Sequence, residues 1–440
     1  MSFARVRTLC ARAAVLALSA PLLVAGSVPA ASFGHAMVPA VDAESQVDFY
    51  ADSEADGTIT LPPCLKSIPL GCFTPQTIRA AYGIQAMLEQ GINGAGRTIV
   101  IIDAFQSPTL DTDVATFDTL FGLPPIHLTK HPMVGIPPWD PDPNKPQLSF
   151  SKEITIDVEL AHVAAPEAAI VLVEASSEKD TDLVAATQFA VDNNLGDVIT
   201  QSFGEAEMCA SQAVLEQQHA VFEKAAEMGI TVFASSGDKG AARQACDGSK
   251  TLVFSASTPA SDPGVTAVGG TRLVAGKEGA YMSETAWNTP APPAIAGASG
   301  GGFSTLYRRP SYQAPLQKDN NKARGVPDVA YNADPGKPFL VIYNGRGAFA
   351  AGTSAGTPQW AAIVALADQA AGHRLGSINK TLYHIGKSDA YSTAFNDVTA
   401  GNNTFMGIAG YDAKPGWDAV TGVGSPNVAN LIPLLIDGKG

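Results

Sequence analysis

The chain has 440 residues, which is enough for one large α/β domain or two smaller ones. Its 28 Lys and Arg are outnumbered by 42 Asp and Glu, and the formal net charge of −14 argues against nucleic acid as a partner. The 42 glycines and 31 prolines, with only 16% charged residues, are typical of a globular chain rich in loops.

The N-terminus has the order of a secretory signal. Arg5, Arg7 and Arg12 precede an apolar run over residues 13–28, and small residues follow up to Ala30. A membrane anchor is the alternative, but the run is short and contains Ser, Pro and Gly. We therefore expect residues 1–30 to be a cleaved signal peptide, the protein to be secreted or extracytoplasmic, and no membrane contact after cleavage.

Four cysteines remain once Cys10 is removed with the signal. An even number in an exported chain predicts two disulfides. Three connectivities are possible, and we favour Cys64–Cys72 and Cys209–Cys246. Their spacing does not indicate a zinc site.

Residues 31–73 are expected to form a short pro-segment or linker, because much of this stretch is polar and weakly patterned. From about Thr74 short apolar runs alternate with helical patterns. The expected strands are 98–104, 169–174, 197–202 and 230–235, and the expected helices are 75–89, 111–121, 153–163, 180–193 and 211–228. This alternation predicts a doubly wound, mainly parallel α/β sheet with helices on both faces and function at the carboxyl ends of its strands.

Residues 259–350 are rich in Gly and Pro, and we expect them to form surface loops around the sheet and not a second domain.

Ser354 is a candidate nucleophile. It lies in the run GTSAGTP (352–358), directly before the apolar stretch QWAAIVAL (359–366), which predicts a buried helix. A serine at a helix start lies among backbone N–H groups that can hold an oxyanion. A loop that simply caps a core helix is the alternative, and the functional interpretation needs a base to activate the hydroxyl.

Three carboxylates could act with this serine. Glu153 and Asp157 are four residues apart on an expected helix, so they project from one face. Such a pair raises one pKa, and a shared proton gives a base suited to acid conditions. Asp238 follows the strand at 230–235, where a neutral carboxyl could donate a hydrogen bond to an oxyanion. A solvated acidic face and an Asx turn are the alternative interpretations.

These motifs together resemble the sedolisin family of serine-carboxyl peptidases. The similar stretches, in the family's order, are EITIDVELAHVAAPEA (153–168), ASSGDKG (234–240), PASDPGVTAVGGT (259–271), ETAWN (284–288), GGGFS (300–304), RGVPDVAYNADPG (324–336) and GTSAGTP (352–358). The resemblance implies a subtilisin-like fold in a single large domain over residues 74–440.

The resemblance also implies roles for four side chains. Ser354 is the expected nucleophile, Glu153 the general base, Asp157 its proton-sharing partner and Asp238 the group at the oxyanion. Glu153 must be ionised to accept a proton while Asp238 must be protonated to donate one, so both demands are met together only at low pH. The expected substrate is a peptide or an unfolded protein, the expected action is that of an endopeptidase, and the expected state is a monomer.

Two further positions belong to the same comparison. Asp103 ends the strand at 98–104, where some family members have an acid linked to the catalytic pair, and a structural aspartate is the alternative. Phe203 stands where some members have tryptophan, so the hydrogen bond of an indole N–H is absent at this position.

The resemblance implies one structural calcium ion near the C-terminus. The stretches FNDVTAGNN and PGWDAVTGVGSPN are similar to the family's calcium site. By position, the ligands are the side chains of Asp397 and Asp418 and the carbonyl oxygens of Val398, Lys414 and Gly416, a donor set that suits calcium.

Other functions remain open at this stage. They are a histidine-dependent subtilase, for which His162 is the nearest candidate, a lipase or esterase with Ser354 in GxSxG, a tripeptidyl exopeptidase of the same family, and a binding protein on an inactive scaffold. Family precursors usually carry a long folded pro-domain, whereas only residues 31–73 separate the expected signal from the expected peptidase domain here.

Overall fold

The computed structural model describes residues 38–39, 48–51, 58–249, 251–289, 296–318 and 321–438. The expected signal peptide, residues 1–30, lies outside the described residues. Two short strands come from the expected pro-segment, β1 (Val38–Pro39) and β2 (Asp48–Ala51). All described residues belong to one compact unit.

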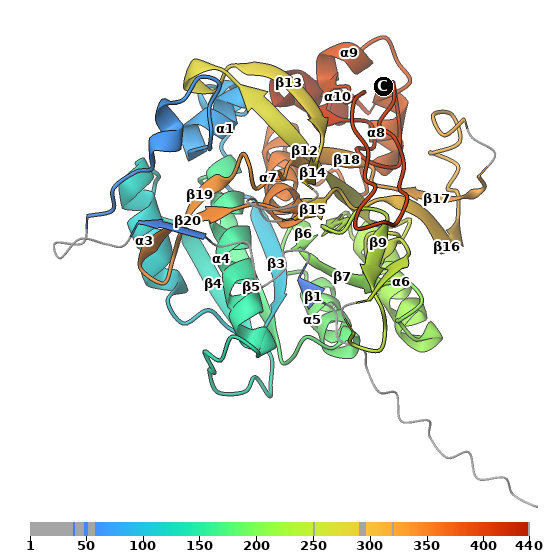
Figure 1. Ribbon diagram of the computed structural model, residues 1–440, viewed down its shortest axis with the longest axis horizontal. Helices are drawn as coiled ribbons and strands as arrows, with labels where there is room; N and C mark the ends of the chain where they lie inside the picture. The colour runs from blue at the N-terminus through green and yellow to red at the C-terminus, as the bar shows by residue number, and fades with distance from the viewer. Residues whose placement is uncertain are drawn as a thin grey trace, which may run out of the picture. The chain divides into compact units, whose positions relative to one another are not determined.

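An eight-stranded sheet forms the centre of the molecule (Figure 1). Its order is β13 (Tyr281–Ala286), β12 (Thr266–Ala275), β8 (Thr231–Ser235), β6 (Val198–Gln201), β3 (Thr98–Ala104), β5 (Ala169–Ala175) and β4 (His127–Pro132), and β18 (Val329–Asn332) also pairs with β12. Every pair in it is parallel except β12 with β13. The prediction of a mainly parallel sheet is therefore confirmed.

Helices cover both faces of this sheet. The helices are α1 (Pro75–Ala81), α2 (Gln85–Leu88), α3 (Leu110–Phe121), α4 (Pro146–Ala164), α5 (Asp180–Asp192), α6 (Gln212–Glu227), α7 (Thr353–Ala371), α8 (Asn379–Ile385), α9 (Tyr391–Ala394) and α10 (Val428–Asp437). On β3, Ile99 and Ile101 pack into the core with α4 and α7, whereas Val100 and Ile102 pack with α5 and α6. Because both faces of β3 are buried, its sequence is a continuous apolar run.

Shorter elements surround the sheet. They are η1 (Pro63–Lys66), β7 (Phe203–Ala206), β9 (Ala242–Gln244), β10 (Leu252–Phe254), β11 (Ser257–Thr258), η2 (Lys277–Gly279), β14 (Asn288–Thr289), β15 (Gly297–Ala298), β16 (Gly302–Arg308), β17 (Ala323–Val326), β19 (Phe339–Tyr343), β20 (Arg346–Ala350), β21 (Phe395–Asn396) and β22 (Ser425–Pro426).

Three expectations about elements are wrong. The helix expected over 153–163 begins earlier, at Pro146, since proline is tolerated in the first turn of a helix. The helix expected over 75–89 is two helices, because Gly83 adopts a φ of 75° between them and no helix continues through that conformation. The stretch 259–350, expected to be surface loops, contributes β12, β13 and β18 to the central sheet. β12 was not predicted because it contains glycines, which are typical of loops. The glycines make room for neighbours, since a Cβ at Gly269 would lie 2.6 Å from Pro327 and one at Gly270 would lie 2.7 Å from Trp287.

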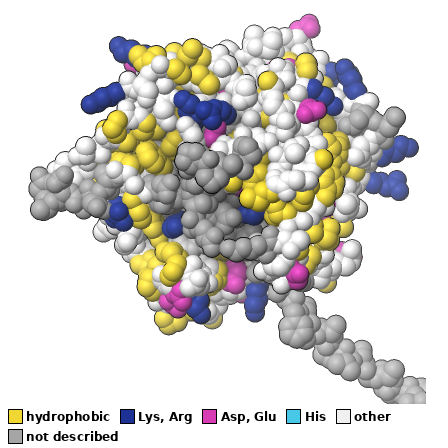
Figure 2. Space-filling model, viewed as in Figure 1, with side chains coloured by type: hydrophobic (Ala, Val, Ile, Leu, Met, Phe, Trp, Pro, Cys, Tyr) yellow, Lys and Arg dark blue, Asp and Glu magenta, His cyan; other side chains and the backbone are white. Residues whose placement is uncertain are grey.

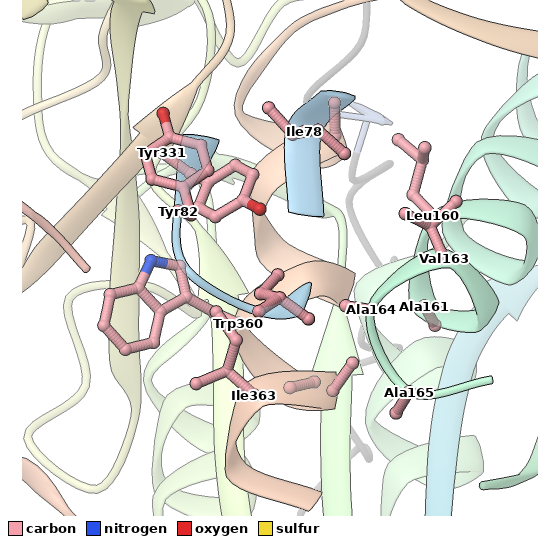
Figure 3. Packing of buried hydrophobic residues seen from close by; sticks show 14 of the residues in the cluster. Ile78, Tyr82, Leu160, Ala161, Val163, Ala164, Ala165, Tyr331, Trp360 and Ile363 are labelled. Atoms are coloured by element: carbon pink, nitrogen blue, oxygen red, sulfur yellow. The ribbon is translucent and has the colours of Figure 1, made fainter. Parts of the chain in front are cut away.

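Helices α4 and α7 pack against each other in the core (Figure 3). Ala161 and Ala164 on α4 are small and buried, so the helix can approach its neighbours closely. Trp360 on α7 is fully buried, and its indole N–H donates to the carbonyl oxygen of Ala330 at 3.0 Å. This packing fixes the relative position of the two helices that carry Glu153 and Ser354.

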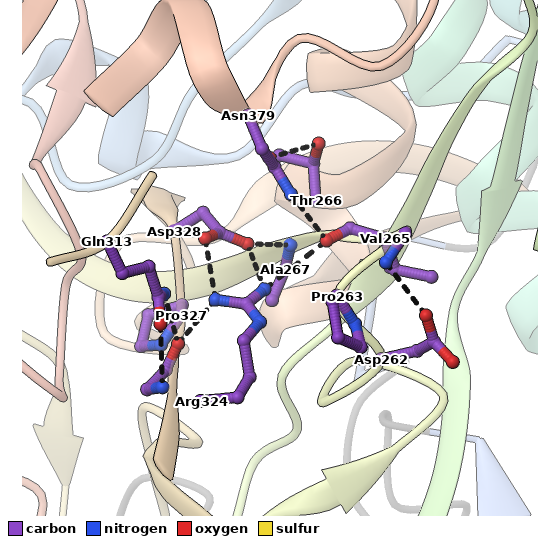
Figure 4. A network of polar contacts seen from close by, with 12 residues as sticks. Asp262, Pro263, Val265, Thr266, Ala267, Gln313, Arg324, Pro327, Asp328 and Asn379 are labelled. Carbon is purple, nitrogen blue, oxygen red and sulfur yellow. Dashed lines mark hydrogen bonds and ion pairs between the residues drawn. The ribbon is translucent and has the colours of Figure 1, made fainter. Parts of the chain in front are cut away.

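A buried ion pair holds β17 and β18 against β12 (Figure 4). Arg324 donates to Asp328 at 2.8 Å, and Asp328 in turn accepts the backbone N–H of Ala267 at 2.8 Å. Because each charge has several hydrogen-bond partners, the pair can be buried without leaving an uncompensated charge. It connects the C-terminal third of the chain to the sheet.

The two expected disulfides, Cys64–Cys72 and Cys209–Cys246, are present. In the ranges that the structure describes, no helix is long and apolar enough to span a bilayer. On the face shown in Figure 2, Lys and Arg lie mainly toward the edge and hydrophobic side chains form patches nearer the middle.

Candidate active site

Ser354 is the second residue of α7. Gly352 precedes the helix with a φ of 94°, a conformation that favours glycine, and the chain turns there directly into the helix. The Ser354 hydroxyl lies 3.5 Å from the carbonyl oxygen of Ser202, which follows β6. The serine is fully buried. Its position at a helix N-terminus is the one expected from the sequence.

Glu153 and Asp157 lie one turn apart on α4, and both are fully buried. Asp157 accepts a hydrogen bond from the Ser202 hydroxyl at 2.8 Å. Neither carboxyl oxygen of Glu153 has a hydrogen-bond partner of ordinary geometry among the described residues. A buried carboxyl with such free acceptor capacity is unusual and points to a functional role.

Burial raises the pKa of Glu153 well above its ordinary value, and the nearby Asp157 and Asp103 raise it further. An interaction with the Ser354 hydroxyl acts in the opposite direction. Burial also raises the pKa of Asp157, while its hydrogen bond from Ser202 lowers it. The structure therefore brings Glu153 together with Ser354 and gives the carboxyl pair a strong tendency to hold a proton.

Asp238 lies on the turn after β8, beside the start of α7. Its Oδ1 accepts both the backbone N–H and the hydroxyl of Thr353, each at 2.8 Å. Thr353 directly precedes Ser354, so these bonds tie the carboxyl to the segment that carries the serine. Burial raises the pKa of Asp238 to about 6, although the two bonds from Thr353 lower it, as do Lys239 and Arg243.

Arg243 is a neighbour that the sequence analysis missed. It is buried on β9, and a Cβ on Gly237 would lie 2.3 Å from its guanidinium. Burial lowers the pKa of Arg243 to about 10, while Asp238 raises it. The Cys209–Cys246 disulfide closes the chain three residues later. The only signal for Arg243 in the sequence is that it follows Asp238 by five residues.

No family model matches the chain. It is 33% identical over 373 residues to kumamolisin of Bacillus sp. (strain MN-32), a match that covers 83% of this chain and 64% of that protein. It is 34% identical over 266 residues to sedolisin of Pseudomonas sp. (strain 101), covering 59% of this chain and 44% of that protein.

Among solved structures, Pseudomonas sedolisin, a serine-carboxyl proteinase complexed with two molecules of pseudo-iodotyrostatin, is similar with a TM-score of 0.72 at 27% identity. That match covers 84% of this chain and 99% of the other. The chain belongs to the sedolisin family. It spans about half to two thirds of the length of the two curated relatives above.

A third relative bears on the mode of action within the sedolisin family. A tripeptidyl-peptidase of Aspergillus fumigatus is 33% identical over 278 residues, which is 54% of this chain and 40% of that protein. The similarity covers less of the chain than that to kumamolisin.

Asp103 adds a third buried carboxyl beside Glu153 and Asp157. It is fully buried at the end of β3, with neither carboxyl oxygen paired among the described residues. Burial raises its pKa, and the nearby Asp157 and Glu174 raise it further. Phe203 is buried in the core formed with α5 and α6. Asp103 therefore lies near Asp157, one of the two carboxyls on α4.

His162 lies apart from this cluster. It is buried more than two turns beyond Glu153 on α4, and its Nε2 lies 2.9 Å from the carbonyl oxygen of Pro124 and 3.1 Å from Asp118. The ring is thus engaged with the segment that follows α3, and not with Ser354.

Of the expected calcium ligands, the side chains of Asp397 and Asp418 both lie against the loop 414–416. The backbone N–H of Gly416 donates to Asp397 at 3.0 Å, and that of Lys414 donates to Asp418 at 2.9 Å, so both carboxylates face the loop 414–416. Among the described residues, no three His, Cys, Asp or Glu side chains group as a metal site. Any cation here needs main-chain oxygens as well, which fits calcium better than zinc.

Proposed function

We propose that the protein is a secreted, acid-acting serine-carboxyl peptidase. The observation that carries the proposal is that Ser354 lies near Glu153 with both side chains fully buried, while Asp157 lies one turn along α4 and Asp238 bonds to Thr353. His162 is engaged with Pro124 and Asp118 instead. The relatives named above and the presence of two disulfides, which form in oxidising compartments, support it.

The mechanism follows from the proton that each group holds. Ser354 Oγ attacks the carbonyl carbon of the substrate while the Glu153 carboxylate takes the hydroxyl proton. Glu153 then gives this proton to the leaving amine, and a water molecule activated by Glu153 hydrolyses the acyl ester. Asp157 lies one turn from Glu153 and stabilises its protonated form.

Asp238 acts on the oxyanion of the tetrahedral intermediate. In its protonated form it donates a hydrogen bond, together with the backbone N–H groups at the start of α7. Because burial raises its pKa to about 6, this proton is held under mildly acid conditions and lost as the pH rises through that value. The proposed peptidase is therefore most active below about pH 6.

Substitution of Ser354 and of Glu153 tests the proposed nucleophile and base. Ser354→Ala and Glu153→Ala should each lower kcat/KM at least about a thousandfold, because each removes a group that acts in the transition state. The exposed Glu216→Ala on α6 should leave it unchanged. The measurement is hydrolysis of an N-acetylated, internally quenched peptide between pH 3 and 8, with the fold of each variant checked by circular dichroism.

The blocked peptide also separates two modes of action. An endopeptidase cleaves it, whereas a tripeptidyl exopeptidase needs the free amine of an unblocked peptide. We propose endopeptidase action, and the similarity to a tripeptidyl-peptidase keeps exopeptidase action as the alternative. Full activity of Glu153→Ala, or an optimum near neutral pH, would contradict the carboxylate mechanism.

We also propose that one calcium ion binds Asp397, Asp418 and the carbonyl oxygens of Val398, Lys414 and Gly416. Support comes from the convergence of the two carboxylates on the loop 414–416. When bound, the ion supplies only positive charge and rigidity to this loop. Trp417, which follows the loop, donates its indole N–H to the carbonyl oxygen of Pro327, and so connects the loop to the segment before β18.

A further inference from the structure

A cavity of about 440 Å³ lies between α8 and the connection from β16 to β17. Ser311, Tyr312 and Pro315 of the connection form one wall, and α8 with the turn that follows it forms the other. Among the described residues that line it there is no proposed catalytic side chain and no proposed calcium ligand. Its volume is within the range of pockets that hold small organic molecules.

Three basic side chains line this cavity along one face of α8. Lys380 and His384 are four residues apart, and Lys387 follows three residues later, so the three lie above one another. The turn after α8 continues this arrangement, because the backbone N–H of Lys387 donates to the carbonyl oxygen of His384 at 3.1 Å. All three side chains are exposed.

The positive charge of this cavity has no partner within the described part of the chain. None of the three basic side chains forms an ion pair with another described residue. No Asp or Glu is among the described residues that line the cavity. The chain as a whole has a formal net charge of −14, so this concentration of positive charge runs against its general character. A concave surface with charge of one sign attracts ligands of the opposite sign.

The tyrosines that line the cavity turn their hydroxyl groups away from it. The Tyr383 hydroxyl donates to Asp328 at 2.8 Å and accepts the side-chain amide of Gln313 at 2.6 Å, so it belongs to the buried network that surrounds Arg324 in Figure 4. The Tyr312 hydroxyl donates to the carbonyl oxygen of Pro263 at 3.0 Å. The two rings, with 5.2 Å between their centroids, are therefore the parts left to line the cavity.

The two walls are fixed by contacts that need no ligand. Asn379, the first residue of α8, accepts the Thr266 hydroxyl at 2.8 Å and donates to the carbonyl oxygen of Val265 at 2.9 Å (Figure 4). Gly386 follows α8, and a Cβ there would lie 2.8 Å from Leu316, so the glycine lets the helix end approach the connection. A pocket that is already formed loses little conformational entropy when a ligand binds.

We propose that this cavity binds a small organic polyanion, a molecule with at least two negative charges on phosphate or carboxylate groups. The three basic side chains donate to the anionic groups, and the hydroxyl of Ser311 donates from the opposite wall. The remaining atoms of the ligand lie on the rings of Tyr312 and Tyr383. The lysine ammonium is a point charge and accepts phosphate and carboxylate alike. The site is separate from the proposed peptidase function and does not depend on it.

Isothermal titration calorimetry of the full chain at pH 6.5 and fixed ionic strength tests the site with two probes. Glucose 6-phosphate carries a phosphate monoester, and tricarballylate carries three carboxylates. Calcium is kept in excess, so that a probe that chelates it cannot empty the proposed calcium site. We expect binding of one molecule per chain. Binding of one probe alone identifies the ligand as a phosphate or as a polycarboxylate, and binding of both identifies a site that recognises charge.

Variants of the two lysines locate the bound probe. The double variant Lys380→Ala/Lys387→Ala should weaken binding at least about tenfold, because it removes two charge-assisted hydrogen bonds. The double variant Lys380→Arg/Lys387→Arg keeps both charges and should bind within about threefold of the wild type. Lys66→Ala removes an exposed lysine elsewhere and is the matched control. Circular dichroism checks the fold of each variant.

Three results would overturn the proposal. The first is that neither probe binds at about 10 mM, a concentration at which a site with a Kd near 1 mM is almost saturated. The second is equal affinity of the wild type and the double alanine variant, which would mean that the anion binds elsewhere. The third is an equal loss of affinity in Lys66→Ala, which would mean that the overall charge of the chain, and not this cavity, governs binding.

Discussion

Asp238 is under opposing influences, and their balance determines the pH at which it can donate a proton. Burial raises its pKa, whereas the two hydrogen bonds from Thr353 and the charges of Lys239 and Arg243 lower it, with a result of about 6. Arg243 is buried beside it, so its charge is poorly screened by water. The upper pH limit of activity should therefore depend on this arginine, which lies outside the proposed catalytic set.

Removing the charge of Arg243 should widen the active pH range upward. In Arg243→Gln the pKa of Asp238 rises, so Asp238 keeps its proton at higher pH. The alkaline limb of the kcat/KM profile should then move up by up to about one pH unit. Arg243→Lys keeps the charge and should leave the limb near that of the wild type.

The matched control for this measurement is Arg308→Gln, an exposed arginine on β16. A downward shift in Arg243→Gln would contradict the assigned direction. The same shift in the lysine variant would mean that the shape of the side chain, and not its charge, acts on Asp238.

The sequence could predict which elements carry the proposed catalytic side chains, but it could not predict this neighbour. Glu153 and Asp157 could be predicted because helical spacing alone places them on one face. Ser354 could be predicted at a helix start because an apolar helical stretch directly follows its motif. Arg243 reaches Asp238 through a tertiary contact that depends on β9 folding back toward Gly237. No local pattern encodes a contact of that kind.

Among the strands too, some could be predicted from local sequence and others could not. The strands β3, β5, β6 and β8 were predicted to within one residue at each end, because each is a short apolar run bounded by polar residues. β12 was missed because its glycines, which make room for Pro327 and Trp287, resemble those of a loop. The strand pairing of β1 and β2 depends on distant partners and has no local signal.

The C-terminal loop offers a test that does not depend on activity. Asp397 is exposed and Asp418 is buried with four internal donors, so Asp397→Ala can remove a proposed calcium ligand with little damage to the fold. Calcium at about a hundred times its Kd should stabilise the wild type by about 2.7 kcal/mol, and the variant much less. Thermal unfolding with calcium and with a chelator measures the difference.

Asp412→Ala, an exposed aspartate of the same region, is the control and should respond to calcium as the wild type does. If calcium raises the Tm of the wild type and of Asp397→Ala equally, the ion binds elsewhere. If it leaves both unchanged, the proposed site is absent.

At the scale of the whole molecule, buried carboxyls make stability depend on pH. Burial is the main reason why the pKa of Asp238 rises to about 6, that of Glu174 to about 7 and that of Asp368 to about 7. Glu153, Asp157 and Asp103 are raised in the same direction. The folded chain therefore binds more protons than the unfolded chain at intermediate pH.

The sign of the effect follows from this difference. A carboxyl whose pKa is raised on folding contributes stability that is complete below its unfolded pKa, near 4, and is lost as the pH rises through its folded pKa. The folded chain should hence be most stable near pH 4 and lose stability steadily up to about pH 7. The lowered pKa values of Asp142, Asp192 and Asp247 belong to exposed or partly exposed groups and oppose this trend only weakly.

Asp368 isolates one contribution, far along α7 from Ser354. Its Oδ1 accepts the backbone N–H of Leu375 at 2.8 Å, a bond that the amide oxygen of Asp368→Asn can keep. Since the amide does not titrate, the variant should lose less stability than the wild type between pH 4 and 7. Urea unfolding at each pH measures this slope, and the exposed Asp389→Asn should reproduce the wild-type slope. Stability that rises with pH over this range would show that the buried carboxyls are ionised in the folded chain, which would also remove the protonated Asp238 on which the proposed mechanism depends.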